Sequence, residues 1–145
     1  MALLDSINDP QKKETLVADC VQLVESQVAA KGGISGLGLK AAYASINSLK
    51  PGYVAGAIER LLPEVLDALD PIWSEAVQTG NAIEFITNHR DRTADMLLGI
   101  TDARIETSSN NVLRGAYSKL RNSAKSDVEE AVPGLAQIIH NYAKG

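Results

Sequence analysis

The sequence has little of two residue types, and each shortage excludes a class of protein. Among its 145 residues there is one cysteine, Cys20, so an internal disulfide is excluded and no CxxC or Cys/His cluster is present. Because Cys20 falls on the apolar face of a predicted helix, we expect a small buried hydrophobe rather than a nucleophile. Aromatic residues make up only 4% of the chain, which favours close helix–helix packing over a large aromatic pocket.

The sequence also lacks an excess of basic residues and long apolar runs. The chain has 14 Lys and Arg against 18 Asp and Glu, a net charge of -4, whereas a general nucleic-acid or anionic-membrane binder has a basic surface. No segment approaches the roughly 18 uninterrupted apolar residues of a membrane span, and the N-terminus does not have the pattern of a signal peptide. We therefore expect a cytoplasmic protein that binds neither nucleic acid nor a membrane.

The remaining composition is that of a globular helical protein. Hydrophobic residues supply 45% and charged residues 22% of the sequence, and the length suits one domain with a sizeable core. We predict a single domain over residues 1–145 with an all-α fold, a compact multi-helix bundle of about six to nine helices.

The stretch from Lys40 to Asp70 has the strongest helical pattern. Pro63 lies inside its apolar stripe and predicts a kink or the first turn of a new helix. Asp70-Pro71 predicts a further helix start, with Trp73 as a packing anchor behind it. The stripe itself has helical spacing and consists of Val54, Ala57, Ile58, Leu61, Leu62, Val65, Leu66 and Leu69.

Capping signals predict other helix boundaries. Asp9 before Pro10 predicts the start of a helix that runs to about Ala30, and Asn81 predicts another start. The polar residues 89–92 predict a bend or a boundary between two helices. Ser126-Asp127-Val128-Glu129 has the Ser-x-x-Glu pattern of a capping box, which predicts that the last helix begins there.

Two parts of the sequence resemble each other. Residues 40–70 align with residues 114–140, with an offset that changes from 74 to 70 around Pro51-Gly52, and Pro63 then matches Pro133. A duplication would divide the chain at roughly 1–72 and 73–145 and predict two pseudo-symmetric helical halves. The alternative is that two amphipathic helices share a pattern without common ancestry. The sequence leaves both interpretations open.

No motif for catalysis, a metal or a cofactor survives inspection. The glycine-rich residues 32–38 lack both the Lys-Ser/Thr pair of a phosphate loop and the GxGxxG spacing of a dinucleotide turn. Four acids at helical spacing have neither a calcium loop nor a Glu-x-x-His pair beside them. We expect a solvated acidic face at Glu64, Asp67, Asp70 and Glu75.

Residues 89–106 hold the densest mixture of acids, bases and imidazole in the chain. This mixture suits a ligand site or an acid–base pair, and the alternative is a solvated surface with ion pairs. The candidate ligand-binding residues are His89, Arg92, Asp95, Asp102 and Arg104. A later segment, with Arg114, Lys119, Arg121 and Lys125, carries only cations, which we expect to pair with acids of the same fold or of a second subunit.

Several segments carry a family resemblance that covers nearly the whole chain. They are KGGISG, LKAAYASI, LKPG, LLPEVLDALDPIW, LLGITDARI and SSNNVLRGAYSKLR. On these segments the chain resembles a small bacterial family of helical proteins without an assigned biochemical activity. The resemblance implies a stand-alone cytoplasmic domain and brings no catalytic residues.

Two functional hypotheses follow. The first, which we favour, is a non-enzymatic helical interaction or structural module that forms a homo-oligomer or binds a protein partner. The second is a small-ligand-binding protein or enzyme that uses the polar cluster from His89 to Glu106.

Overall fold

Helices make up nearly all of the structure. The computed structural model describes residues 3, 8–50 and 52–143, and within these ranges every side chain except those at positions 34, 35, 122, 123 and 143. Over these ranges there are no strands, and the six α-helices are α1 (Pro10–Ala30), α2 (Gly33–Asn47), α3 (Tyr53–Gln78), α4 (Ala82–Asn88), α5 (Arg90–Glu106) and α6 (Asn111–Ala143). The predicted all-α fold class is confirmed. None of these helices has both the length and the apolar character needed to cross a membrane.

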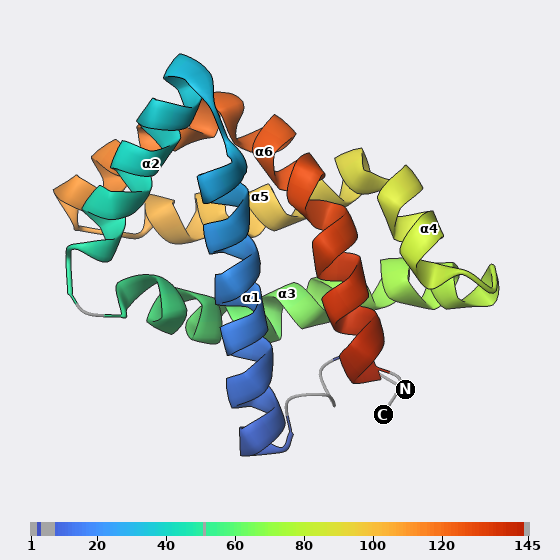
Figure 1. Ribbon diagram of the computed structural model, residues 1–145. Coiled ribbons are helices and arrows are strands. Elements are labelled where there is room, and N and C mark those ends of the chain that lie inside the picture. Colours follow the sequence, from blue (N-terminus) through green and yellow to red (C-terminus); the bar gives the residue numbers. More distant parts are fainter. Residues whose placement is uncertain (1–2, 4–7, 51, 144–145) are drawn as a thin grey trace.

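Helix α6 touches most of the other helices. It is 33 residues long and contacts α1, α2, α4 and α5. In Figure 1 it changes direction along its length, so that its first part lies beside α2 and α5 and its last part beside α1. Helix α3 crosses α1 and also contacts α2, α4 and α5. The bundle is therefore organised around two long helices, α3 and α6.

The predicted caps of α1 and α4 are confirmed. The Asp9 carboxylate accepts a hydrogen bond of 3.0 Å from the backbone N–H of Gln11, with Pro10 in the first turn. The Asn81 side chain accepts a bond of 3.2 Å from the backbone N–H of Glu84. The predicted boundary at residues 89–92 is also present, because α4 ends at Asn88 and α5 begins at Arg90. Each cap satisfies a free helical N–H with a neighbour in the sequence.

The helix start predicted at Pro71 and the alternative of a new helix at Pro63 are wrong, whereas a kink at Pro63 stays a prediction. Helix α3 continues through Pro63 and Pro71, and the Asp70 carboxylate accepts a bond of 3.0 Å from the Leu3 N–H instead of capping a helix. An interior proline costs about 3 kcal/mol or more, whereas each large apolar side chain buried near these prolines stabilises the fold by about 1.5–3 kcal/mol. Since several are buried along this one helix, their burial outweighs the loss. The buried residues of α3 are Leu62, Leu66, Leu69, Ile72, Trp73 and Ala76.

The predicted start of the last helix at Ser126 is also wrong, because α6 runs unbroken through the Ser126 to Glu129 box. Pro133 lies inside α6 as well, between Val132 and Ala136, each 1% exposed. The same balance of burial against a lost backbone hydrogen bond applies here.

Most of the tightly packed core lies at one end of the bundle. It unites α1, the second half of α3, α4 and the last part of α6. Trp73 is 6% exposed inside it, which confirms a packing role, and Cys20 is a buried free cysteine, as predicted. Burial and then the nearby Asp19 carboxylate raise the pKa of the Cys20 thiol to about 11, so the thiol is protonated at neutral pH.

The other end of the bundle is packed less tightly. In α3, the apolar stripe before Leu62 is only half-buried, whereas Leu66 and Leu69 are 2% and 1% exposed. The half-buried residues of the stripe are Val54, Ala57, Ile58 and Leu61. The stripe is therefore covered fully at one end and partly at the other.

The two sequence segments that resemble each other fold differently. Residues 40–70 span α2, a turn and α3, with Gly52 at φ 71° before α3, a conformation that favours glycine. Residues 114–140 lie within α6 without a turn. The change of offset in the alignment thus falls at this turn, and the duplication stays a prediction.

The core assignment predicts the cost of removing one of its side chains. Leu69→Ala should lower the free energy of unfolding by about 2–5 kcal/mol, because a fully buried leucine leaves a cavity when truncated. Leu37→Ala, at a leucine that is 69% exposed on α2, should change it by less than about 0.5 kcal/mol. Chemical denaturation followed by circular dichroism measures both, and equal losses would contradict the assigned core.

Candidate functional site

The candidate residues of α5 face two different neighbours. Towards α3, Arg92 Nη2 lies 3.0 Å from a Glu75 carboxylate oxygen. Arg104 Nη2 likewise lies 3.1 Å from a Glu64 oxygen.

Towards α6, Lys125 Nζ lies 3.1 Å from Asp95 Oδ1, and Arg121 Nε lies 3.0 Å from Asp102 Oδ1. The predicted pairing of the cation-rich segment with acids of the same fold is thus confirmed for Arg121 and Lys125. All four of the ion pairs made by α5 are about half exposed, and such pairs contribute about 0–1 kcal/mol each. Their main effect is to fix how α5 sits between α3 and α6.

His89 lies apart from these ion pairs. Its Nδ1 is 2.8 Å from the carbonyl oxygen of Phe85, and the two rings stack with centroids 4.2 Å apart. Its interactions are therefore with the preceding turn of α4. The five candidate residues lie on one segment, but their side chains do not converge on one point. Their ligand-binding role stays a prediction.

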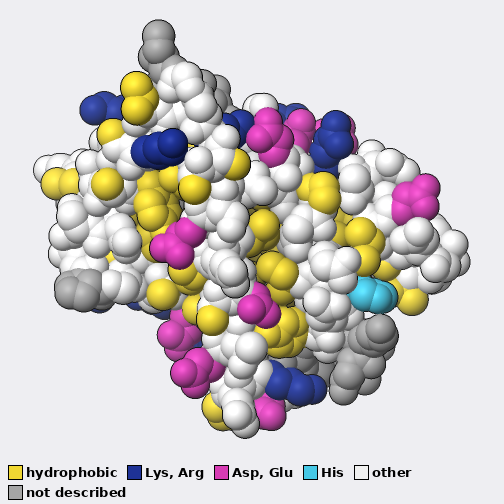
Figure 2. Space-filling view, in the orientation of Figure 1, with side chains coloured by type: hydrophobic (Ala, Val, Ile, Leu, Met, Phe, Trp, Pro, Cys, Tyr) yellow, Lys and Arg dark blue, Asp and Glu magenta, His cyan; other side chains and the backbone are white. Residues whose placement is uncertain are grey.

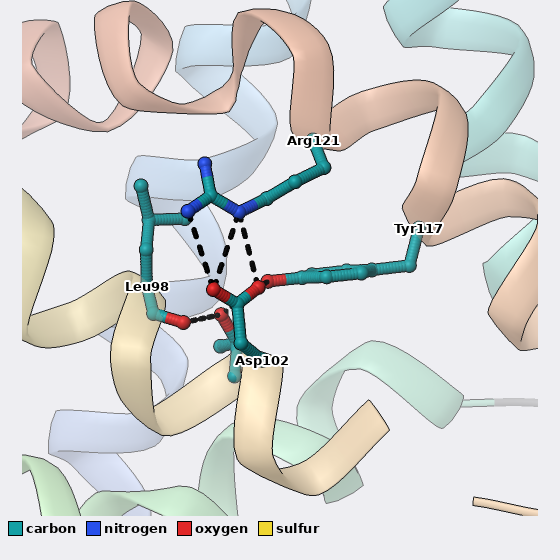
Figure 3. A network of polar contacts seen from close by, with 5 residues as sticks. Leu98, Asp102, Tyr117 and Arg121 are labelled. Carbon is teal, nitrogen blue, oxygen red and sulfur yellow. Dashed lines mark hydrogen bonds and ion pairs between the residues drawn. The ribbon is translucent and has the colours of Figure 1, made fainter. Parts of the chain in front are cut away.

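Asp102 is the candidate residue with the most partners (Figure 3). Its Oδ1 accepts from the Tyr117 hydroxyl and from Arg121 Nε, and its Oδ2 accepts from Arg121 Nη2 at 3.2 Å. The Thr101 hydroxyl lies 2.7 Å from the Tyr117 hydroxyl and donates to the Leu98 carbonyl. This network joins α5 to α6.

The network shifts the pKa values of its members in opposite directions. Hydrogen bonds from Arg121 and then Tyr117 hold the pKa of Asp102 below its usual value. Burial and then the Asp102 carboxylate raise the pKa of Tyr117. The sequence signal for this arrangement was the spacing of Tyr117 and Arg121, one helical turn apart on α6, which lets both side chains reach the same carboxylate.

Two cavities lie between the helices, the first at the less tightly packed end and the second against the buried core. The first, about 420 Å³, is bounded by α1, α2, the start of α3, the end of α5 and the start of α6. The second, about 360 Å³, is bounded mainly by α1, α3 and α6, and its lining is almost entirely apolar. Figure 2 shows hydrophobic side chains left visible along both sides of α1.

The two cavities adjoin. Both are lined by Val24, Ile58, Leu61 and Thr101, so the two spaces meet at these side chains. Ligand sites are typically concave, mostly apolar spaces of about 300–1,000 Å³ with a few polar groups. Each cavity falls in that range.

The polar groups around the cavities differ in what they contact. The Tyr43 hydroxyl, in the first cavity, is buried and makes no well-formed hydrogen bond with the described residues, although the Glu25 carboxylate lies close to it. Burial and then the Glu25 carboxylate raise its pKa. Arg60 lies over the Tyr53 ring, 6.0 Å from its centroid, and both line the same cavity.

At the second cavity, Lys31 is held by two carboxylates. Its Nζ lies 2.8 Å from Asp127 Oδ1 and 2.8 Å from Glu130 Oε2. Hydrogen bonds to these two groups raise the pKa of Lys31. This cation therefore already has its counter-ions.

Metal binding has no support in the described ranges, where no group of three His, Cys, Asp or Glu side chains is placed to hold an ion. Of the five candidate residues, only Arg104 lines a cavity. The sequence did not single out Tyr43 or Arg60. The sequence feature that could have pointed to this region was the apolar stripe of α3, because its first half needs other groups to cover it from water.

Comparison with known proteins identifies a family for this sequence. The sequence matches the family of unknown function DUF6918 over residues 3–143. No curated protein and no solved structure matches the chain.

The Asp102 network predicts a pH-dependent loss of stability. Because the pKa of Asp102 is lower in the folded protein than in the unfolded chain, about 3.9, its stabilisation is present above that pH and disappears as the pH falls through the folded value. Asp102→Asn should therefore lower the Tm at pH 7, and its difference from wild type should shrink below about pH 4.

Asp95→Asn is the matched control, because Asp95 makes a more exposed ion pair with Lys125. It should change the Tm little. A Tm difference for Asp102→Asn that is constant from pH 7 to pH 3, or one no larger than that of the control, would contradict the assigned role of the network.

Proposed function

Because the chain belongs to this family of unknown function, which assigns no activity, we propose from the geometry that it is a non-enzymatic binding protein for a hydrophobic small molecule. The observation that carries the proposal is the pair of adjoining cavities, about 420 and about 360 Å³. Apolar surface left in contact with water costs about 25 cal/mol per Å² relative to burial. A hydrophobic ligand that fills the cavities removes this cost.

The chemistry of the lining favours binding over catalysis. Cys20 borders the second cavity, but its raised pKa keeps it as a thiol, and the thiolate is the reactive form. Tyr117 borders the first cavity, but its hydroxyl donates to Asp102. Asp102 in turn is bound by Arg121. Tyr117, Asp102 and Arg121 therefore bind one another, and none of them is directed at a substrate.

The proposal modifies the second functional hypothesis from the sequence, the small-ligand-binding protein, and leaves the first, the interaction module, as a prediction. It keeps a small ligand but moves the binding site from the polar cluster at residues 89–106 to the cavities. Self-association, binding of a protein partner and the cytoplasmic location remain predictions. The exposed large hydrophobic side chains in the described ranges lie on three different helices and are Leu37, Val77 and Val112.

Filling either cavity should weaken the binding of a hydrophobic probe. The neutral fluorophore Nile red should bind wild type saturably with increased emission. Ala57 lines the first cavity and Ala131 the second, so Ala57→Phe and Ala131→Phe should each weaken this binding about tenfold or more, since the phenyl ring occupies the space.

Ala103→Phe is the matched control, because Ala103 is exposed on α5 and lines neither cavity. It should bind Nile red like wild type. Circular dichroism checks that all three variants fold. The absence of saturable binding to wild type, or equal weakening by the control, would overturn the proposed function.

A further inference from the structure

We propose that the ligand is a single-chain fatty acid, with its carboxylate bound by Arg60 at the first cavity and its hydrocarbon tail extending into the second. This inference rests on the proposed function and specifies the ligand class. Three features of the lining carry it: a cation without a counter-ion, a buried hydroxyl without a well-formed hydrogen bond, and an apolar space beyond them.

The cation is Arg60. No carboxylate of the described residues forms an ion pair with it, and Glu64, one turn further along α3, is paired with Arg104. Arg60 is exposed, its guanidinium lies over the Tyr53 ring at 6.0 Å from the centroid, and both residues line the first cavity. Guanidinium groups bind carboxylates through paired, charge-assisted hydrogen bonds. The first cavity therefore has an unoccupied recognition group for a carboxylate.

The hydroxyl is that of Tyr43. It is buried, makes no well-formed hydrogen bond although the Glu25 carboxylate lies close to it, and lines the same cavity as Arg60. A buried donor of this kind is costly to leave unpaired, and an oxygen of the ligand head satisfies it. Glu25 is the opposing charge near Tyr43, but it is exposed, so water and salt screen it.

The tail belongs in the second cavity because that cavity has no comparable group. Lys31 there already contacts both Asp127 and Glu130, so it has little attraction for a third carboxylate. The rest of the lining is almost entirely apolar and includes Leu62, Leu66, Val132 and Leu135. Both cavities are small within the usual range of about 300–1,000 Å³ for ligand sites, which fits one hydrocarbon chain rather than two.

The test compares oleate with oleyl alcohol, which share one hydrocarbon chain and differ in the head group. Each is titrated below its aggregation limit, with displacement of Nile red as the readout. Wild type should bind oleate about tenfold more tightly than oleyl alcohol. Arg60→Gln should remove most of this preference and leave the affinity for oleyl alcohol unchanged.

Three further variants separate the local contact from general charge effects. Arg90→Gln removes an exposed cation of α5 that lines neither cavity, and it should leave the preference for oleate intact. Tyr43→Phe should weaken oleate binding with little change in the Tm, because the hydroxyl it removes makes no well-formed hydrogen bond. Glu25→Gln should strengthen oleate binding, because it removes the opposing charge.

The outcomes distinguish this inference from the proposed function. If wild type binds Nile red but binds oleate and oleyl alcohol equally, the fatty-acid inference is overturned and the binding function stands. If Arg90→Gln reduces the preference as much as Arg60→Gln, recognition by Arg60 is overturned. If none of the three compounds binds wild type, the proposed function itself fails.

Discussion

The rest of the structure depends on how the apolar stripe of α3 is covered. Around Leu66 and Leu69 the stripe is fully buried, and the stabilisation gained there is enough to carry the helix through Pro63 and Pro71. Before Leu62 the stripe is only half-buried and borders the first cavity, whereas the second cavity lies along the stripe from Ile58 to Leu66. The core and the proposed ligand site thus share one face of α3 and overlap around Leu62 and Leu66.

Electrostatic contacts add specificity to this arrangement rather than much stability. On helix α5, arginines form ion pairs with acids of α3, and aspartates form ion pairs with bases of α6. Each pair is about half exposed and weak on its own, but opposite signs on its two sides prevent α5 from exchanging its neighbours. Since the end of α5 borders the first cavity, these pairs also hold one of its walls in place.

What the sequence predicted well was either local or a property of the whole chain. The Asp9 and Asn81 caps were predictable because each is satisfied within three residues, and the all-α fold followed from apolar periodicity and composition. The starts assigned to Pro71 and Ser126 were wrong because contacts distant in the sequence outweighed local signals. The cavities were beyond prediction, since they exist only once five helices are placed together, and so Tyr43 and Arg60 were not singled out.

The most direct test of the account is methyl NMR of the protein with a neutral long-chain methyl ester that carries a nitroxide on its tail. Paramagnetic broadening reports which side chains lie near the hydrocarbon. The account predicts broadening of methyl signals from Val24, Leu61 and Val132, which line the cavities, with Leu37 and Val77 unaffected on the exposed surface. Broadening confined to those exposed residues, with the cavity methyls unchanged, would contradict it.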